Sequence, residues 1–203
     1  MGFATTVLRI VTGATMAGHG VQKLTDSLGG RGPEAAAESF EKMGFRPGRP
    51  FALATGVAET AGGAMMVAGL GTPAACAMIS GVMTGAIVKV RSKHGFWMRD
   101  GGLEYNLHIL AATFAVAGAG GGALTLDALR GKKHRGFGWA VAQLAIGAGT
   151  AAAALAIADR QSGDNWPGPT PTDLWLDRED SGSSAPVDLT TQSEVGEHAH
   201  ATA

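Results

Sequence analysis

Scarcity of cysteine and of charge narrows the chemistry open to this 203-residue chain. Its one cysteine, Cys76, cannot form an intramolecular disulfide and belongs to no paired-cysteine redox or zinc motif. Charged residues make up 16% of the chain, and the basic ones are too scattered for a nucleic-acid-binding surface. There is no phosphate-binding loop, and no serine or cysteine lies in a recognisable nucleophile motif. These absences exclude cysteine chemistry, nucleic-acid binding and the common nucleophile-based hydrolases.

A dinucleotide-binding domain is excluded as well. The segment GAGGGA at 118–123 fits the loose glycine pattern of such domains. It ends an apolar helix instead of following a strand, so the required strand, loop and helix context is missing.

Charge is concentrated outside five long apolar segments, and the lengths of these segments are the main signal for the fold. They cover residues 3–24, 50–71, 72–90, 104–122 and 137–158. Each is close to the roughly 20 residues that cross a bilayer. Their small and aliphatic residues are those that transmembrane helix interfaces favour. The sequence therefore predicts an all-α integral membrane protein, with a four-helix bundle followed by a fifth transmembrane helix.

Two of the five segments have an alternative interpretation. The first could be a cleaved signal peptide, but no Lys or Arg precedes its apolar part and no small-x-small cleavage site follows. It is therefore interpreted as a helix. The fifth is rich in alanine and contains Gln143, so an amphipathic or peripheral helix is its alternative.

The polar connections divide the chain into three predicted parts. Residues 1–127 form the four-helix membrane domain, with a short helix at about 33–43 lying on the membrane surface. Residues 128–158 contain a basic loop and the fifth helix, and residues 159–203 are acidic and short of aliphatic side chains, which predicts a disordered tail. The distribution of Lys and Arg favours an N-terminus outside the cell.

Two short features interrupt the tail. Trp166 and Trp175 flank a proline-containing segment that could dock on a partner, although most such tails are only solvated. His198 and His200 could bind a metal weakly, although terminal histidines are more often incidental.

The first apolar segment has a polar stripe, which a helix of this length should turn toward protein. At 100° per residue, the stripe contains Thr5, Arg9, Thr12, Met16, His19 and Lys23. Arg9 near mid-helix would cost about 3 kcal/mol on insertion scales, so it needs a partner, a wet cavity or a snorkelling route to the surface. We predict that Arg9 and Glu59, the carboxylate of the second segment, stabilise one another directly, through water or through a polar neighbour.

Glycines in the second and third segments predict close helix contacts. Gly62 and Gly63 lie one turn from Glu59, and Gly81 and Gly85 form a GxxxG pattern. For this pattern, contact within the chain is favoured over dimerisation.

Connectivity places several polar residues at one depth in the membrane. At 1.5 Å per residue, His19, Glu59 and His108 lie roughly 6–12 Å inside one surface, with Glu104 nearer to it. We predict that these four residues line a shared pocket for a polar headgroup such as that of a quinone. A metal site is the weaker option, because no HExxH-like spacing fixes the ligands, and no metal is assigned. A polar network that only holds the helices together remains the alternative.

Four motifs, in order, carry a family resemblance over about residues 3–127. They are LRI with GHGVQKL, then MGFRPG, then AETAGGAMMVAGLGT, and finally HGFW with GGLEYNLHILAA. In these motifs the chain resembles the DoxX family of small bacterial integral membrane proteins. The resemblance implies a four-helix bundle in the bacterial plasma membrane. The family's polar positions map onto Arg9, His19, Glu59, Glu104 and Tyr105.

The activity implied by the resemblance is less uniform than the fold. Family members and relatives are associated with a thiosulfate:quinone oxidoreductase subunit, with oxidative-stress assemblies and with protein-handling membrane receptors. We therefore expect a membrane subunit of an oxidoreductase or oxidative-stress assembly, without a catalytic motif of its own or a covalent cofactor. Its expected partners are the lipid bilayer and redox or stress-response proteins, with the tail as the candidate contact. The candidate quinone-binding residues are Arg9, His19, Glu59, Glu104, Tyr105 and His108. The alternatives are a non-catalytic membrane anchor or receptor that recruits a partner protein, and a small-solute transporter.

Overall fold

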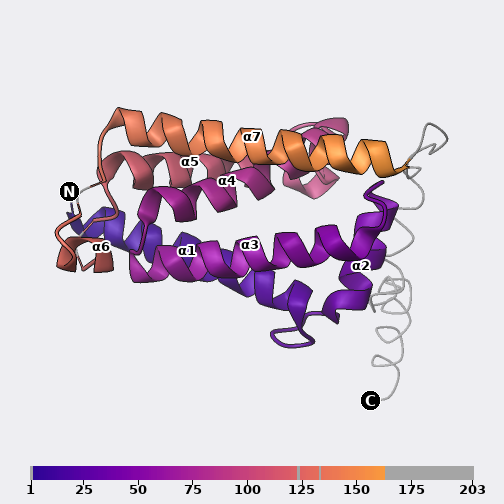
Figure 1. The fold of residues 1–203 in the computed structure, drawn as a ribbon, viewed down its shortest axis with the longest axis horizontal. Coiled ribbons are helices and arrows are strands. Elements are labelled where there is room, and N and C mark those ends of the chain that lie inside the picture. Colours follow the sequence, from indigo (N-terminus) through magenta and orange to yellow (C-terminus); the bar gives the residue numbers. More distant parts are fainter. Residues whose placement is uncertain (1, 123, 133, 163–203) are drawn as a thin grey trace, which may run out of the picture. The chain divides into compact units, whose positions relative to one another are not determined.

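The computed structural model describes residues 2–122, 124–132 and 134–162, and every regular element within them is a helix (Figure 1). The five long helices are α1 (Gly2–Leu24), α3 (Gly48–Ala68), α4 (Thr72–Lys89), α5 (Glu104–Ala119) and α7 (Phe137–Ser162). The short ones are α2 (Gly32–Lys42), η1 (Arg91–His94), η2 (Met98–Asp100) and α6 (Leu126–Leu129). All belong to one compact unit, Met1–Gly168. The predicted tail features at Trp166, Trp175, His198 and His200 lie outside the described residues.

Within this unit, α4 packs against helices on both sides of the bundle, and α1 also contacts α5. On one side, α1 packs along α3, and α3 packs against α4; on the other, α5 and α7 pack against α4 and against each other. Figure 1 shows α1 and α3 side by side, with α4, α5 and α7 grouped next to them. The predicted four-helix bundle and its fifth helix are therefore confirmed.

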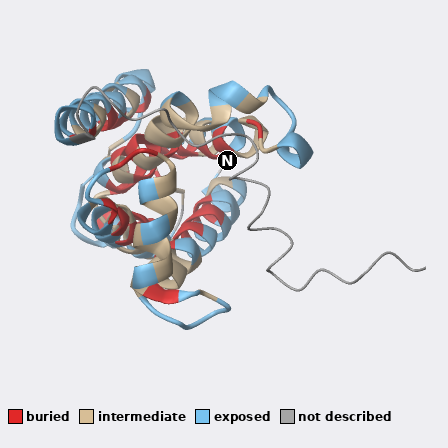
Figure 2. Cartoon of the chain, turned by 90° about the vertical axis from the view of Figure 1, so that its right-hand side faces the viewer, coloured by how far each residue is buried: buried red, intermediate tan, exposed pale blue. Residues whose placement is uncertain are grey.

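The distribution of polar side chains is that of a membrane protein. Many large apolar side chains are exposed on the outside of the helices, among them Val11, Val57 and Ile157. Polar side chains such as Ser80 and Thr113 are buried instead. Figure 2 shows the buried residues on the inner faces of the helices and the exposed residues on the outer faces. A soluble protein has the reverse tendency, so these outer faces suit contact with lipid.

Three helices, α3, α4 and α7, are long and apolar enough to cross a membrane by length and composition. The fifth predicted segment therefore meets the requirement for a spanning helix. Spanning by α1 and α5 stays a prediction. α1 carries polar residues along its stripe, and α5 has 16 residues, or about 24 Å at 1.5 Å per residue.

Glycines determine where two of the predicted helices end. α3 stops at Ala68 because Gly69 adopts φ +64°, and Gly71, at φ +53°, precedes the first turn of α4. α5 stops at Ala119 because Gly120 adopts φ +87°. The second and fourth segments are therefore three residues shorter at their C-terminal ends than predicted. The short turn between α3 and α4 makes them the antiparallel neighbours that the sequence indicates.

Small residues let the helices approach closely, as predicted. A Cβ atom added at Gly63 would lie 2.5 Å from the Gly13 carbonyl oxygen of α1. One added at Gly81 would lie 2.7 Å from Thr150 Oγ1 of α7. The GxxxG pattern therefore makes a contact within the chain, which confirms the favoured interpretation.

Candidate functional site

A cavity of about 930 Å³ is bordered by α1, α2, α3, α4, α5 and α7. Its walls are mainly apolar, and three of the aromatic rings that line it contact one another at tilted angles. The ring centroids of Phe40 and Phe45 are 5.4 Å apart, and those of Phe45 and Phe51 are 5.1 Å apart. The main polar side chains that line the cavity are His19, Lys23, Glu59, Arg91, Tyr105, Asn106 and Gln143. A large apolar cavity with a few polar groups is the usual form of a small-molecule site.

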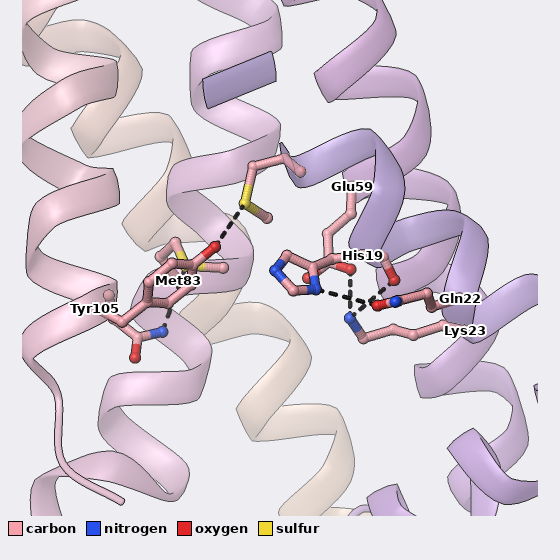
Figure 3. A network of polar contacts seen from close by, with 8 residues as sticks. His19, Gln22, Lys23, Glu59, Met83 and Tyr105 are labelled. Carbon is pink, nitrogen blue, oxygen red and sulfur yellow. Dashed lines mark hydrogen bonds and ion pairs between the residues drawn. The ribbon is translucent and has the colours of Figure 1, made fainter. Parts of the chain in front are cut away.

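A lysine and a glutamate form an ion pair at the cavity wall. Lys23 Nζ on α1 lies 2.5 Å from Glu59 Oε2 on α3 (Figure 3). The glutamate is 3% exposed, so its charge is removed from solvent and depends on this partner. Of the three arrangements predicted for Arg9 and Glu59, the direct pair is not formed, because Glu59 pairs with Lys23 and the Arg9 guanidinium donates to backbone carbonyls. Lys23 lies in the predicted polar stripe of the first segment, and this position is the sequence feature that could have identified it as a residue of the site.

His19 and Tyr105 lie near this ion pair. Their ring centroids are 6.1 Å apart with an edge-on geometry, and His19 Nδ1 lies 3.3 Å from Gln22 Oε1. The Tyr105 hydroxyl donates to the Met16 sulfur over 3.9 Å, and a thioether is a weak acceptor. The hydroxyl can therefore exchange this bond for one to a ligand at little cost.

Arg9 is buried at the opposite end of α1, away from the cavity wall. Its side chain is 1% exposed and donates to backbone carbonyls at the C-terminal ends of two helices. Nε donates to Gly121 O over 2.8 Å, Nη1 donates to Met66 O and to Val67 O, and Nη2 donates to Leu124 O over 3.2 Å. The end of a helix leaves carbonyls unpaired and carries partial negative charge, which suits a guanidinium. Within the described part of the chain Arg9 forms no ion pair with a carboxylate, and it does not line the cavity.

Asp127 caps the N-terminal end of α4 at the same end of the bundle. Gly71 N donates to its Oδ1 over 2.9 Å, and Thr72 N and Thr72 Oγ1 donate to its Oδ2 over 3.0 and 3.3 Å. Burial alone would raise the pKa of Asp127. The hydrogen bonds from Thr72 and Gly71 outweigh burial, with a smaller contribution from His134, and hold the pKa below its ordinary value. No motif in the sequence predicts this cap.

Glu104 and His108 also lie away from the cavity. Glu104 Oε2 accepts a hydrogen bond from Met98 N over 3.0 Å, which fixes the turn before α5. His108 is exposed, and its Nδ1 lies 2.8 Å from the Glu104 backbone oxygen. Both residues are two positions from the buried Asn106, which places them about 160–200° away around the helix. The predicted shared pocket therefore contains His19 and Glu59 but not Glu104 or His108.

A second polar cluster joins α4, α5 and α7, and the sequence had not indicated it. Ser80 Oγ lies 3.0 Å from Thr113 Oγ1 and donates to Gln143 Oε1 over 2.7 Å. Further along the α4–α5 contact, Asn106 Nδ2 donates to the Met83 sulfur over 3.3 Å. Asn106 and Thr113 are seven residues apart on one face of α5, and that spacing was the available signal.

Part of the chain that forms this site is similar to a known family. The DoxX family model matches residues 4–92. The match supports membership of the DoxX family over these residues. No match was found among curated proteins or solved structures. The match, together with three helices long and apolar enough to span and with apolar outer helix faces, indicates a membrane protein in contact with the lipid bilayer. The matched residues include His19, Lys23 and Glu59, whereas Tyr105 and Gln143 follow the matched region.

Proposed function

We propose that this DoxX protein binds a quinone-like amphiphile in its cavity, as a membrane subunit of an oxidoreductase or oxidative-stress assembly in the bacterial plasma membrane. One observation carries the proposal: a large apolar cavity next to the Lys23–Glu59 ion pair, His19 and Tyr105. A helix bundle that only anchors a partner has no need for a cavity of this size beside a buried ion pair.

The cavity suits a quinone-like ligand in size and in chemistry. Its volume of about 930 Å³ is at the upper end of the range for drug-sized ligands, which leaves room for a ring and part of an apolar tail. The Tyr105 hydroxyl and the Lys23 ammonium can donate hydrogen bonds to carbonyl oxygens, and the Glu59 carboxylate can accept from hydroxyls. A bound quinone would supply two-electron, two-proton redox chemistry.

The residues of the chain would orient this ligand. His19 is exposed at the cavity, where a ring nitrogen can donate or accept a hydrogen bond. Apolar side chains such as Met16 and Phe51 would exclude water from the tail. The proposal contains no catalytic residue, since electron transfer would require a partner protein.

The proposal assigns a role to each part of the chain. Residues 1–127 provide most of the ligand-binding walls, and residues 128–158 add the fifth helix, which contributes Trp139 and Gln143. Residues 159–203 would recruit the redox or stress-response partner. If the cavity binds no ligand, the alternative function is that of a non-catalytic membrane anchor that recruits a partner protein.

The test is a binding titration of the purified full-length protein in nanodiscs with decylubiquinone. Wild type should show saturable binding. Tyr105→Phe and His19→Ala should each weaken it by roughly 3- to 10-fold, the loss of about one hydrogen bond. His108→Ala is the matched control and should bind like wild type, because His108 does not line the cavity. Absence of saturable binding, or equal weakening in all three variants, would refute the proposed site.

A further inference from the structure

Gln143 is a buried amide on α7 whose hydrogen bonds are incomplete. Its side chain is 1% exposed, and Oε1 accepts from Ser80 Oγ, but Nε2 has no hydrogen-bond partner among the residues that the structure describes. A buried polar atom without a partner is unfavourable and uncommon, so it calls for an explanation.

The incomplete pairing does not depend on which amide atom faces Ser80. If the nitrogen and oxygen are interchanged, Nε2 donates to Ser80 Oγ and Oε1 becomes the unpaired atom. One polar atom of Gln143 is left over in both orientations.

Gln143 also lies on the α7 face that borders the cavity. Trp139, Gln143, Ile146 and Thr150 all line it, at the three- and four-residue spacing of one helix face. Hydrogen bonds fix the position of the amide, because Ser80 Oγ contacts both Gln143 and Thr113 of α5. A polar group fixed in this way loses little conformational entropy when it binds a ligand.

We infer that Gln143 is a second hydrogen-bonding point of the cavity, for an oxygen of the ligand other than the one at the Lys23–Glu59 end. The inference rests on the proposed ligand-binding function and narrows the ligand to an amphiphile with two separate oxygen substituents. An amide can donate or accept, so both carbonyl and hydroxyl forms would bind. Because α7 follows the residues matched to DoxX, this contact would be a feature of the chain beyond the matched region.

The test compares Gln143→Met with Ser80→Ala in the decylubiquinone titration. Both variants remove the hydrogen bond between Ser80 and Gln143, but only Gln143→Met removes the amide. Gln143→Met should weaken binding by roughly 5- to 10-fold, and Ser80→Ala should weaken it clearly less. Gln143→Glu keeps an acceptor for Ser80 and serves as a second variant if the methionine protein does not fold; it should also weaken binding.

Each outcome separates this inference from the function on which it rests. Wild-type binding that depends on Tyr105 but is unchanged in Gln143→Met overturns the inference and leaves the proposed function standing. Weakening by Ser80→Ala equal to that by Gln143→Met also overturns it, because the amide would then act only in helix packing. Absence of saturable wild-type binding refutes both.

Discussion

Replacing Arg9 with methionine should destabilise the protein without affecting ligand binding. The guanidinium joins three parts of the bundle, since it extends from α1 to the last turn of α3 and to the segment after α5. Methionine fills a similar volume but donates no hydrogen bond. The Gly121, Met66, Val67 and Leu124 carbonyls would all lose the charged donor.

The expected decrease in the free energy of unfolding is the difference between two contributions, the lost hydrogen bonds and the relieved burial of the Arg9 charge. A hydrogen bond to a charged group contributes about 1.5–3 kcal/mol, so four would sum to about 6–12 kcal/mol. Removal of Arg9 also relieves the unfavourable burial of its charge, which offsets several kcal/mol. The net destabilisation should be on the order of 3–5 kcal/mol. For a chain of this size, that lowers the melting temperature by roughly 10 °C.

Thermal unfolding in one detergent, followed by circular dichroism, measures this effect. Arg9→Lys should be intermediate, because an ammonium lacks the planar fork that reaches several carbonyls. Because Arg9 and Glu59 have separate partners, the effects of Arg9→Met and Glu59→Gln should add. An Arg9→Met protein as stable as wild type, or coupling to Glu59 above about 1 kcal/mol, would refute this reasoning.

Three further predictions concern other contacts. Lys23→Met should destabilise the protein by about 3–5 kcal/mol in the same melts, because it leaves Glu59 buried without its partner, and adding Glu59→Gln should restore much of the loss. The Asp127 carboxylate has a lowered pKa when folded, so its stabilisation is complete above the ordinary pKa of 3.8 and is lost as pH falls through the folded value. Melts from pH 6 to pH 2 should therefore show a smaller acid-induced loss in Asp127→Asn. Gly81→Val should cost about 1–3 kcal/mol by separating α4 from α7, whereas Gly85→Ala, whose added Cβ would lie 3.9 Å from its nearest neighbour, should be tolerated.

Helix positions and the inward face of α1 could be read from the sequence. Apolar length fixed the long helices, and the stripe through Arg9, Thr12 and Met16 is buried as its 100° periodicity predicts. The fixed rise of 1.5 Å per residue likewise put His19 and Glu59 at a common level.

The rotation of each helix about its axis and the hydrogen bonds from side chains to backbone carbonyls could not be predicted from the sequence. Glu104 lies near the predicted level, yet the rotation of α5 turns it away from the cavity, and only helix packing determines that rotation. The partners of Arg9 are carbonyls, which every residue has, so no side-chain pattern marks them. The environment of Gln143 depends on the packing of α7 beside Ser80, which no pattern in the sequence predicts.

Photolabelling with an azidoquinone, followed by mass spectrometry of the labelled peptides, tests the ligand-binding cavity most directly. We expect label on segments that line the cavity, including those with Met16 and Trp139, and competition by excess decylubiquinone. Label spread over lipid-facing positions such as Val57 and Ile157, without competition, would contradict the proposed function.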